Sequence, residues 1–287
     1  MTTEGMLANS LGVKVEIKQM PIGKYTINYL TAGSGPPLLL IHGANFGWGI
    51  WYPNISVLAQ HFRIYAIDLP GAGRSTRVKY NHLDLRKDFL DVVDEFIRRI
   101  SVDRLHIIGC SIGGWIALQM ARRHPAIVDK IVLMNTFGFT DYIRWMEGSI
   151  GFYPLAWVIA NSALKAKRQN KNVETFLRGI FFDKHLDLKP EFIEYFYETM
   201  ASSHNLLFIS RCVKLRQELL FRDQLPQIPN RVLIVWGKED KIMRLEKNMP
   251  YFSLFPNVAI RLVESAGHIP SVERPEIFHT AVISFLK

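Results

Sequence analysis

The stretch Leu105-His106-Ile107-Ile108-Gly109-Cys110-Ser111-Ile112-Gly113-Gly114 decides how this chain folds. Its first four residues are mostly apolar, which is typical of a short buried strand. The residues from Trp115 to Arg123 favour a helix because most of them are apolar or basic helix formers. Between the two lies a G-x-S-x-G pattern centred on Ser111. The sequence therefore predicts a strand, a sharp turn and a helix in immediate succession.

The predicted turn indicates a catalytic role for Ser111. A serine at such a tip sits in strained backbone, and neighbours with a Cβ atom would clash there, which explains the glycines. The backbone N–H of Ile112 and the start of the following helix face the space where an oxyanion would develop. Ser111 is therefore a candidate nucleophile, and Cys110 should point into the core. The alternative is a glycine-rich turn with a surface serine.

Length and composition fit a globular protein that builds a full core, as one large α/β domain or as a core with an insertion. The 287 residues are 48% hydrophobic and 21% charged. A formal net charge of +9 can indicate a nucleic-acid or membrane partner. The charges are mostly dispersed and no nucleic-acid-binding motif is present, so no nucleic-acid partner is expected. We interpret the densest basic group, residues 165–171, as a solvated loop; a membrane contact there is not favoured.

The cysteines and the N-terminal residues predict a cytoplasmic protein. Cys110 and Cys212 are far apart in the sequence, so no disulfide framework is implied. Residues 1–18 have neither a cationic start nor an apolar stretch, and no segment is long enough to span a bilayer. No metal-ligand cluster, P-loop or dinucleotide fingerprint appears, and so neither a metal nor a cofactor is expected.

Apolar runs outward from the opening stretch predict eight strands. The first two form a hairpin around Gly23, and the first of them is expected to be an edge strand with one face in water. The continuous apolar runs are typical of parallel strands buried on both faces. The strands are expected at residues 13–19, 25–32, 38–41, 63–67, 105–108, 131–134, 231–235 and 258–263. Helices are expected at residues 51–60 and 82–100, after Ser111, and from Pro275 toward Leu286.

Five motifs in this order resemble the α/β-hydrolase family, and together they cover residues 38–275. They are His42-Gly43 after the third strand, Asp68-Leu69-Pro70-Gly71-Ala72-Gly73-Arg74-Ser75, the G-x-S-x-G turn, Trp236-Gly237-Lys238-Glu239-Asp240, and Gly267-His268 followed by P-x-x-E-x-P. The resemblance implies a mostly parallel eight-stranded sheet flanked by helices, with an α-helical cap inserted after the sixth strand.

The resemblance also implies roles for single residues. Ser111, Asp240 and His268 match the catalytic triad in the order usual for this fold. The backbone N–H groups of Ala44 and Ile112 match the oxyanion hole. Glu239 is next to Asp240 but falls outside the pattern. The turn from Asp68 to Ser75 matches a structural signature, so neither of its end residues is assigned a catalytic role.

By the same resemblance, residues 137–229 form a helical cap on a core made of residues 1–136 and 230–287. This region is rich in aromatic residues, which suggests an apolar cavity for a hydrophobic small molecule. The alternative is that these aromatics only pack the cap onto the core. Some of four residues are expected to face the substrate: Trp145, Phe152, Trp157 and Phe208.

A serine at the turn implies acyl chemistry. The expected activity is hydrolysis of a carboxylic ester or lactone of a hydrophobic small molecule, through an acyl-enzyme on Ser111. Meta-cleavage-product C–C hydrolases use the same triad and are the alternative. Their oxyanion loop usually reads H-G-x-G-P-G, and a tryptophan commonly follows the catalytic histidine. This chain has His42-Gly43-Ala44-Asn45-Phe46-Gly47 and Ile269 at these places, and both differences favour ester hydrolysis. A ligand receptor or a non-hydrolytic cyclase that uses the same pocket is the third possibility.

Overall fold

The protein is built around one eight-stranded sheet. The computed structural model describes residues 2–44, 46–79, 82–140, 178–200, 215 and 217–287. The strands are β1 (Val15–Ile22), β2 (Tyr25–Ala32), β3 (Pro37–Ile41), β4 (Arg63–Ile67), β5 (Leu105–Cys110), β6 (Val128–Met134), β7 (Arg231–Gly237) and β8 (Val258–Val263). They lie in the order β1-β2-β4-β3-β5-β6-β7-β8.

The sheet is mostly parallel, as predicted. β1 and β2 form an antiparallel hairpin, and β2 is antiparallel to β4. All other neighbours, from the β4–β3 pair to the β7–β8 pair, run parallel. This is the sheet of the α/β-hydrolase fold, and it brings the carboxyl ends of β3, β5, β6, β7 and β8 to one edge.

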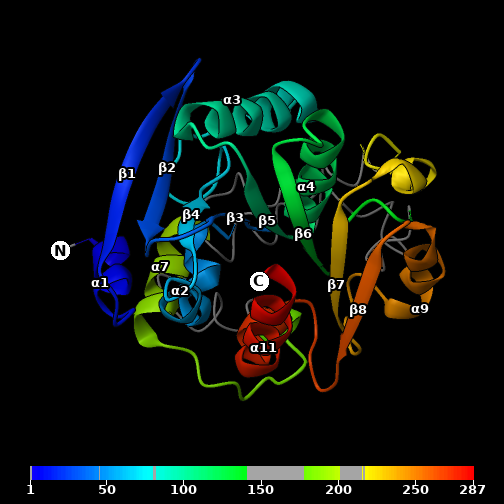
Figure 1. Ribbon diagram of the computed structural model, residues 1–287. Helices are drawn as coiled ribbons and strands as arrows, with labels where there is room; N and C mark the ends of the chain where they lie inside the picture. The colour runs from blue at the N-terminus through cyan, green and yellow to red at the C-terminus, as the bar shows by residue number, and fades with distance from the viewer. Residues whose placement is uncertain (1, 45, 80–81, 141–177, 201–214, 216) are drawn as a thin grey trace.

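Helices cover both faces of the sheet (Figure 1). Alternate residues of the central strands face opposite layers: Leu39 and Ile41 belong to the hydrophobic cluster on one face, Leu38 and Leu40 to the cluster on the other. The first cluster includes α3 (Asp91–Ile100) and α4 (Ile112–Arg123), and the second includes α2 (Tyr52–Leu58) and α11 (Pro275–Leu286). Burial on both faces explains why these strands read as continuous apolar runs.

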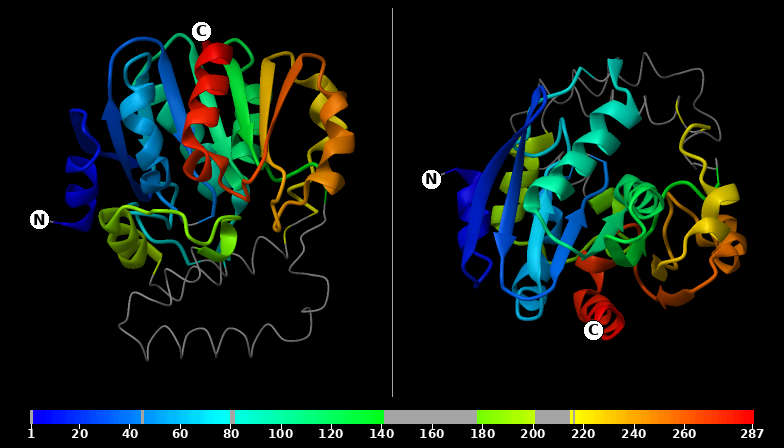
Figure 2. Two further views of the ribbon diagram at one scale, coloured as in Figure 1. Left: turned by 90° about the horizontal axis from the view of Figure 1, so that it is seen from below. Right: turned by 45° about the horizontal axis from the view of Figure 1, so that its top comes forward.

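A short helix that the sequence patterns did not indicate, α1 (Thr3–Asn9), packs beside α7 (Pro190–Met200) (Figures 1 and 2). Its seven residues are too few for a periodic pattern to show. Buried Glu4 fixes it, because its carboxylate accepts hydrogen bonds from Asn28 Nδ2 at 2.8 Å and from Trp48 Nε1 at 2.7 Å.

The helix expected from residue 82 starts later than predicted. A π-helical turn, η3 (Arg86–Leu90), precedes α3. Asp88 accounts for the irregular start, since its carboxylate accepts hydrogen bonds from the Asp84 N–H and from the Tyr25 hydroxyl.

β1 also differs from the prediction of one wet face. Its residues are mostly exposed on both faces, and Ile17 keeps 37% of its surface in solvent. β1 is the outermost strand of the sheet, as predicted, and at this position it is less buried than the central strands such as β3.

The remaining short helices flank the strand ends. They are η1 (Trp48–Trp51), η5 (Arg222–Gln227), α9 (Leu245–Asn248), η6 (Met249–Leu254) and α10 (Pro270–Glu273). All strands found lie within residues 15–134 and 231–263, and none falls in the described parts of residues 137–229. This fits an insertion after the sixth strand, and its boundaries stay a prediction.

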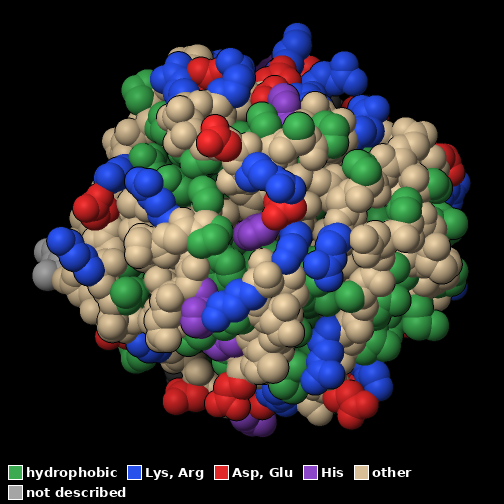
Figure 3. All heavy atoms as spheres, in the orientation of Figure 1, with side chains coloured by type: hydrophobic (Ala, Val, Ile, Leu, Met, Phe, Trp, Pro, Cys, Tyr) green, Lys and Arg blue, Asp and Glu red, His purple; other side chains and the backbone are tan. Residues whose placement is uncertain are grey.

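Charged side chains are spread over the face that Figure 3 shows, with basic and acidic groups interspersed. The basic group at residues 165–171 lies outside the described residues. Of the helices in the described ranges, none combines the length and the apolar character needed to cross a bilayer.

Candidate active site

The candidate catalytic residues lie at the carboxyl edge of the parallel strands. His42 follows β3, Ser111 follows β5, and Asp240 and His268 come after β7 and β8. Ligands of open α/β sheets bind at this edge. The topology therefore brings together positions that are up to 226 residues apart in the sequence, His42 and His268.

Ser111 occupies a strained turn. Its φ and ψ are 54° and −117°, outside the regions that a residue with a side chain normally adopts. A Cβ atom on Gly109 would lie 2.3 Å from the Gly113 carbonyl oxygen, and one on Gly113 would lie 2.3 Å from the Ile41 carbonyl oxygen. Both contacts are impossible, so the two glycines permit the close approach of β5, β3 and α4 that presents Ser111 at the tip.

The loop after β3 runs directly against Ser111. A Cβ atom on Gly43 would lie 3.2 Å from the Ser111 Cβ. Within the described residues, neither the Ala44 N–H nor the Ile112 N–H meets an acceptor. Two unpaired donors beside Ser111 are what an oxyanion hole requires.

His42 holds this loop in place through hydrogen bonds at both of its ring nitrogens. Its Nδ1 donates to the Gly43 carbonyl, and its Nε2 accepts a hydrogen bond from the Leu69 N–H at 2.9 Å. Complete burial lowers the pKa of His42 to about 4, while the bond to Gly43 opposes the shift. His42 is therefore neutral near pH 7. Its two hydrogen bonds connect the residues that follow β3 and β4.

Asp240 and His268 form a buried pair. Asp240 Oδ2 lies 2.8 Å from His268 Nδ1, and each residue is 4% exposed. Asp240 Oδ1 accepts hydrogen bonds from the Ile242 N–H at 2.7 Å and the Met243 N–H at 3.0 Å. The Asp240 carboxylate thus accepts a hydrogen bond from the Nδ1–H of the imidazole and leaves its Nε2 free to take a proton.

Glu239, the sequence neighbour that competes for the acid position, points elsewhere. Its Oε2 accepts a hydrogen bond from the Ala266 N–H at 3.0 Å. The geometry therefore separates the two carboxylates, and Asp240 is the one that meets the imidazole.

Asn135 belongs to the site, although the sequence reasoning did not select it. Its Nδ2 donates to Asp240 Oδ2 at 2.5 Å, and its Oδ1 accepts from the Gly237 N–H at 3.2 Å. It is fully buried at a φ of 44°, one residue after Met134, whose carbonyl accepts the Ser111 N–H at 2.9 Å. A polar residue at the carboxyl end of a buried parallel strand was the signal available in the sequence.

Ser111 and His268 are not hydrogen-bonded within the described residues. Such contacts in unliganded enzymes often tighten only when substrate binds. The four aromatic residues expected to face the substrate lie outside the described residues: Trp145, Phe152, Trp157 and Phe208. In the described ranges, no three metal-ligating side chains gather in one place.

Cys110 faces the core, as predicted. It is fully buried in the same hydrophobic cluster as α2 and α11. Burial raises the pKa of its thiol far above the ordinary value, and the Asp240 charge adds to this effect. A thiol held neutral in the core is a poor nucleophile.

Aromatic residues of the inserted region that the structure describes pack onto the core. Phe192 stacks on Tyr52 with ring centroids 4.6 Å apart, and Tyr195 lies 5.4 Å from Trp48. For Phe192 and Tyr195 of α7, the alternative interpretation, that the aromatics pack onto the core, is therefore the correct one.

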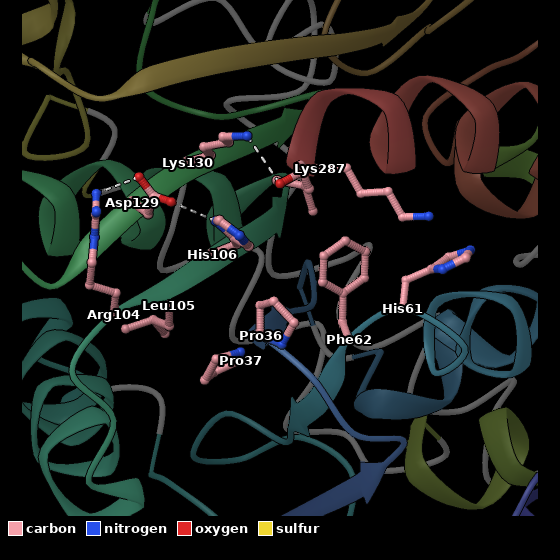
Figure 4. A pocket seen from close by; sticks show the side chains of 11 residues that line it. Pro36, Pro37, His61, Phe62, Arg104, Leu105, His106, Asp129, Lys130 and Lys287 are labelled. Atoms are coloured by element: carbon pink, nitrogen blue, oxygen red, sulfur yellow. Dashed lines mark hydrogen bonds and ion pairs between the residues drawn. The ribbon is translucent and has the colours of Figure 1, made fainter.

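A separate hollow of about 600 Å³ lies at the opposite edge of the sheet (Figure 4). It is lined by the amino ends of β3, β5 and β6, where Asp129 contacts Arg104 at 2.6 Å and His106 at 3.6 Å. The sheet separates this hollow from Ser111, so it is not the reaction site.

Residues 36–275 match the family model of the alpha/beta hydrolase fold. Because the match covers most of the chain and the sheet has the corresponding topology, the protein belongs to the α/β-hydrolase family. It is accordingly an enzyme of the hydrolase class.

Two curated proteins illustrate its relatives. The chain is 26% identical over 256 residues to the carboxylesterase YbfK of Bacillus subtilis (strain 168), covering 88% of this chain and 80% of that protein. It is 26% identical over 278 residues to the 2-hydroxy-6-oxo-6-(2'-aminophenyl)hexa-2,4-dienoic acid hydrolase of Metapseudomonas resinovorans, covering 92% and 88%.

The crystal structure of the carboxylesterase CesB (YbfK) from Bacillus subtilis superposes with a TM-score of 0.76. The alignment has 21% identity and covers 99% of this chain and 95% of that one. At this identity the likeness concerns the fold alone.

Proposed function

We propose that this enzyme hydrolyses a carboxylic ester or lactone of a hydrophobic small molecule through an acyl-enzyme on Ser111. One observation carries the proposal: the buried contact of 2.8 Å between Asp240 and His268, at the sheet edge where Ser111 sits on its strained turn. These are the three groups that acyl transfer by a serine needs.

In the first half of the reaction, Ser111 Oγ attacks the acyl carbon while His268 Nε2 takes the hydroxyl proton. The tetrahedral intermediate then collapses, the bond to the alcohol breaks, and His268 returns the proton to the departing alkoxide oxygen. In the second half, water attacks the acyl-enzyme, and His268 takes a proton from the water and gives it to Ser111 Oγ. Asp240 stabilises the imidazolium in both halves.

The Ala44 and Ile112 N–H groups bind the oxyanion in this scheme. Their support is the close approach of the β3 loop to Ser111 and the absence of another acceptor for either N–H among the described residues. Such a donor typically contributes about 3 to 4 kcal/mol to transition-state stabilisation.

Ester cleavage is preferred over C–C bond cleavage, although both have relatives of equal identity. The preference rests on the loop His42-Gly43-Ala44 and on Ile269, which both depart from the pattern usual in the C–C hydrolases. The hydrophobic substrate rests on the aromatic content of residues 137–229. A cytoplasmic location stays a prediction; it is compatible with Cys110, a free and buried thiol.

A substrate panel tests the proposal. Acyl esters of graded chain length, lactones and meta-cleavage dienone acids are offered to the wild type and to Ser111→Ala. We expect turnover of hydrophobic esters or lactones by the wild type alone. Cleavage of the dienone acids in preference to every ester would establish the C–C hydrolase, and tight binding of a small molecule without turnover would establish a receptor.

A further inference from the structure

Glu273 is a buried carboxylate that the scheme above does not use. It ends α10, five residues after His268, and only 2% of its surface is exposed. It is the glutamate of the P-x-x-E-x-P pattern. Within the described residues, no basic side chain forms an ion pair with its carboxylate, so backbone N–H groups must compensate the charge.

One oxygen of Glu273 holds the backbone on both sides of His268. Its Oε1 accepts hydrogen bonds from the Gly267 N–H at 2.9 Å and from the Ile269 N–H at 3.2 Å. The N–H of His268 itself donates to the Ile180 carbonyl at 3.2 Å. Three consecutive N–H groups of the histidine loop are therefore fixed.

The other oxygen holds a segment from the inserted region. Glu273 Oε2 accepts a hydrogen bond from the Phe182 N–H at 2.6 Å. The two segments are in close contact, since a Cβ atom on Gly267 would lie 2.8 Å from the Phe182 nitrogen. Phe181, only 2% exposed, anchors this segment in the core.

The bonds of Glu273 need a hydrogen-bond acceptor at both oxygens of its side chain. Burial raises the pKa of Glu273, while the bonds from Gly267, Phe182, Ile269 and Asp183 oppose the shift. A glutamine would place its one carbonyl oxygen toward one segment and its NH₂ group toward the N–H groups of the other. In either orientation of the amide, Glu273→Gln therefore loses the hydrogen bonds to the histidine loop or the hydrogen bond to Phe182.

We propose that Glu273 is a positioning residue: its carboxylate locks the backbone of His268 to Ile180–Phe182 and so keeps the imidazole aligned with Ser111. The inference rests on the proposed function. It also makes residues 180–182 of the inserted region part of the support of the catalytic histidine.

The test compares Glu273→Gln with Glu276→Gln, which makes the same chemical change at an exposed glutamate three residues along the chain. We measure kcat and KM on the best ester and the rate at which a fluorophosphonate reacts with Ser111. Since a displacement of about 1 Å can cost about 100-fold in rate, Glu273→Gln should lower kcat and the labelling rate about 10-fold to 100-fold. KM should change less than about threefold, and Glu276→Gln should match the wild type.

A folded Glu273→Gln protein with the kcat and labelling rate of the wild type would overturn the role of Glu273. Should that variant not fold, Glu273→Asp carries the same test, because it keeps the charge but reaches fewer of the N–H groups; full activity in the aspartate variant would be equally decisive. A wild type that neither turns over esters nor reacts with the fluorophosphonate would overturn the proposed function itself.

Discussion

Asp240 is held by four donors at once, and this arrangement ties its role to its geometry. They are His268 Nδ1, Asn135 Nδ2 and the N–H groups of Ile242 and Met243. Asp240→Asn must turn an NH₂ group toward one pair of donors, so it disturbs the imidazole. We expect kcat to fall about 10³-fold or more with binding retained, measured by steady-state kinetics on an ester.

Glu239→Gln is the matched control for Asp240→Asn. A glutamine can still accept the hydrogen bond from Ala266, so this variant should keep the wild-type kcat. If Glu239→Gln were inactive and Asp240→Asn active, the acid would be Glu239.

Asn135 fixes Asp240 from the adjacent strand. Asn135→Gly removes the bonds to Asp240 and Gly237 while tolerating the φ of 44°. Losing a hydrogen bond to a charged group costs about 1.5 to 3 kcal/mol, so kcat should fall at least about 10-fold with little change in KM. Asn135→Ala should have the same kcat as Asn135→Gly. Its free energy of unfolding should be about 1 kcal/mol lower than that of the glycine variant, because alanine is strained in left-handed backbone. A Gly variant with full kcat would show that Asn135 serves packing only.

The helix α7 is attached to the core through aromatic contacts. Phe192 is fully buried against Tyr52. Phe192→Ala should lower the free energy of unfolding by about 3 to 5 kcal/mol in denaturant titrations. Phe182→Ala removes a phenylalanine that is 41% exposed and should cost less than about 1 kcal/mol. Equal losses in both variants would contradict this view of α7.

Elements with a strong local pattern were predicted well. β2, β8 and α11 have the expected bounds, since alternation, apolar runs and a proline mark their limits. α1 and the start of α3 could not be predicted because they depend on distant partners: Glu4 bonds to Trp48, and Asp88 bonds to Tyr25.

The same distinction applies to the site. Motifs around Ser111, Asp240 and His268 indicated its residues, and the structure adds the contact that joins the last two. Glu273 stands in the P-x-x-E-x-P pattern and Asn135 follows a buried strand, but neither signal indicated a role. Their hydrogen-bond partners are known only once the strands are assembled.

For the whole molecule, the buried groups His42 and Asp68 give opposite pH dependences. Burial lowers the pKa of His42 from 6.5 to about 4, so its contribution to stability is complete above pH 6.5 and is lost as the pH falls toward 4. Burial raises the pKa of Asp68 from 3.8 to about 7, so its contribution is present at low pH and is lost as the pH rises toward 7. The two effects offset each other between pH 4 and 6.5.

Comparison with His42→Gln isolates the histidine. Glutamine can keep bonds to Gly43 and Leu69 but does not titrate. We expect the stability advantage of the wild type to shrink by about 3 kcal/mol between pH 7 and pH 4, at about 1.4 kcal/mol per unit. Urea titrations at several pH values measure this difference, and a constant difference would show that His42 is not held neutral.

Site mapping of a fluorophosphonate label shows directly whether Ser111 is the nucleophile. The wild type and Cys110→Ala should each take up one equivalent, found by peptide mass spectrometry on Ser111, because Ser111 is the proposed nucleophile and lies at the sheet edge that also carries the His268–Asp240 pair. Ser111→Ala should take up none. Equal labelling of Ser111→Ala, or a label on Cys110 in the wild type, would show that Ser111 is not the nucleophile.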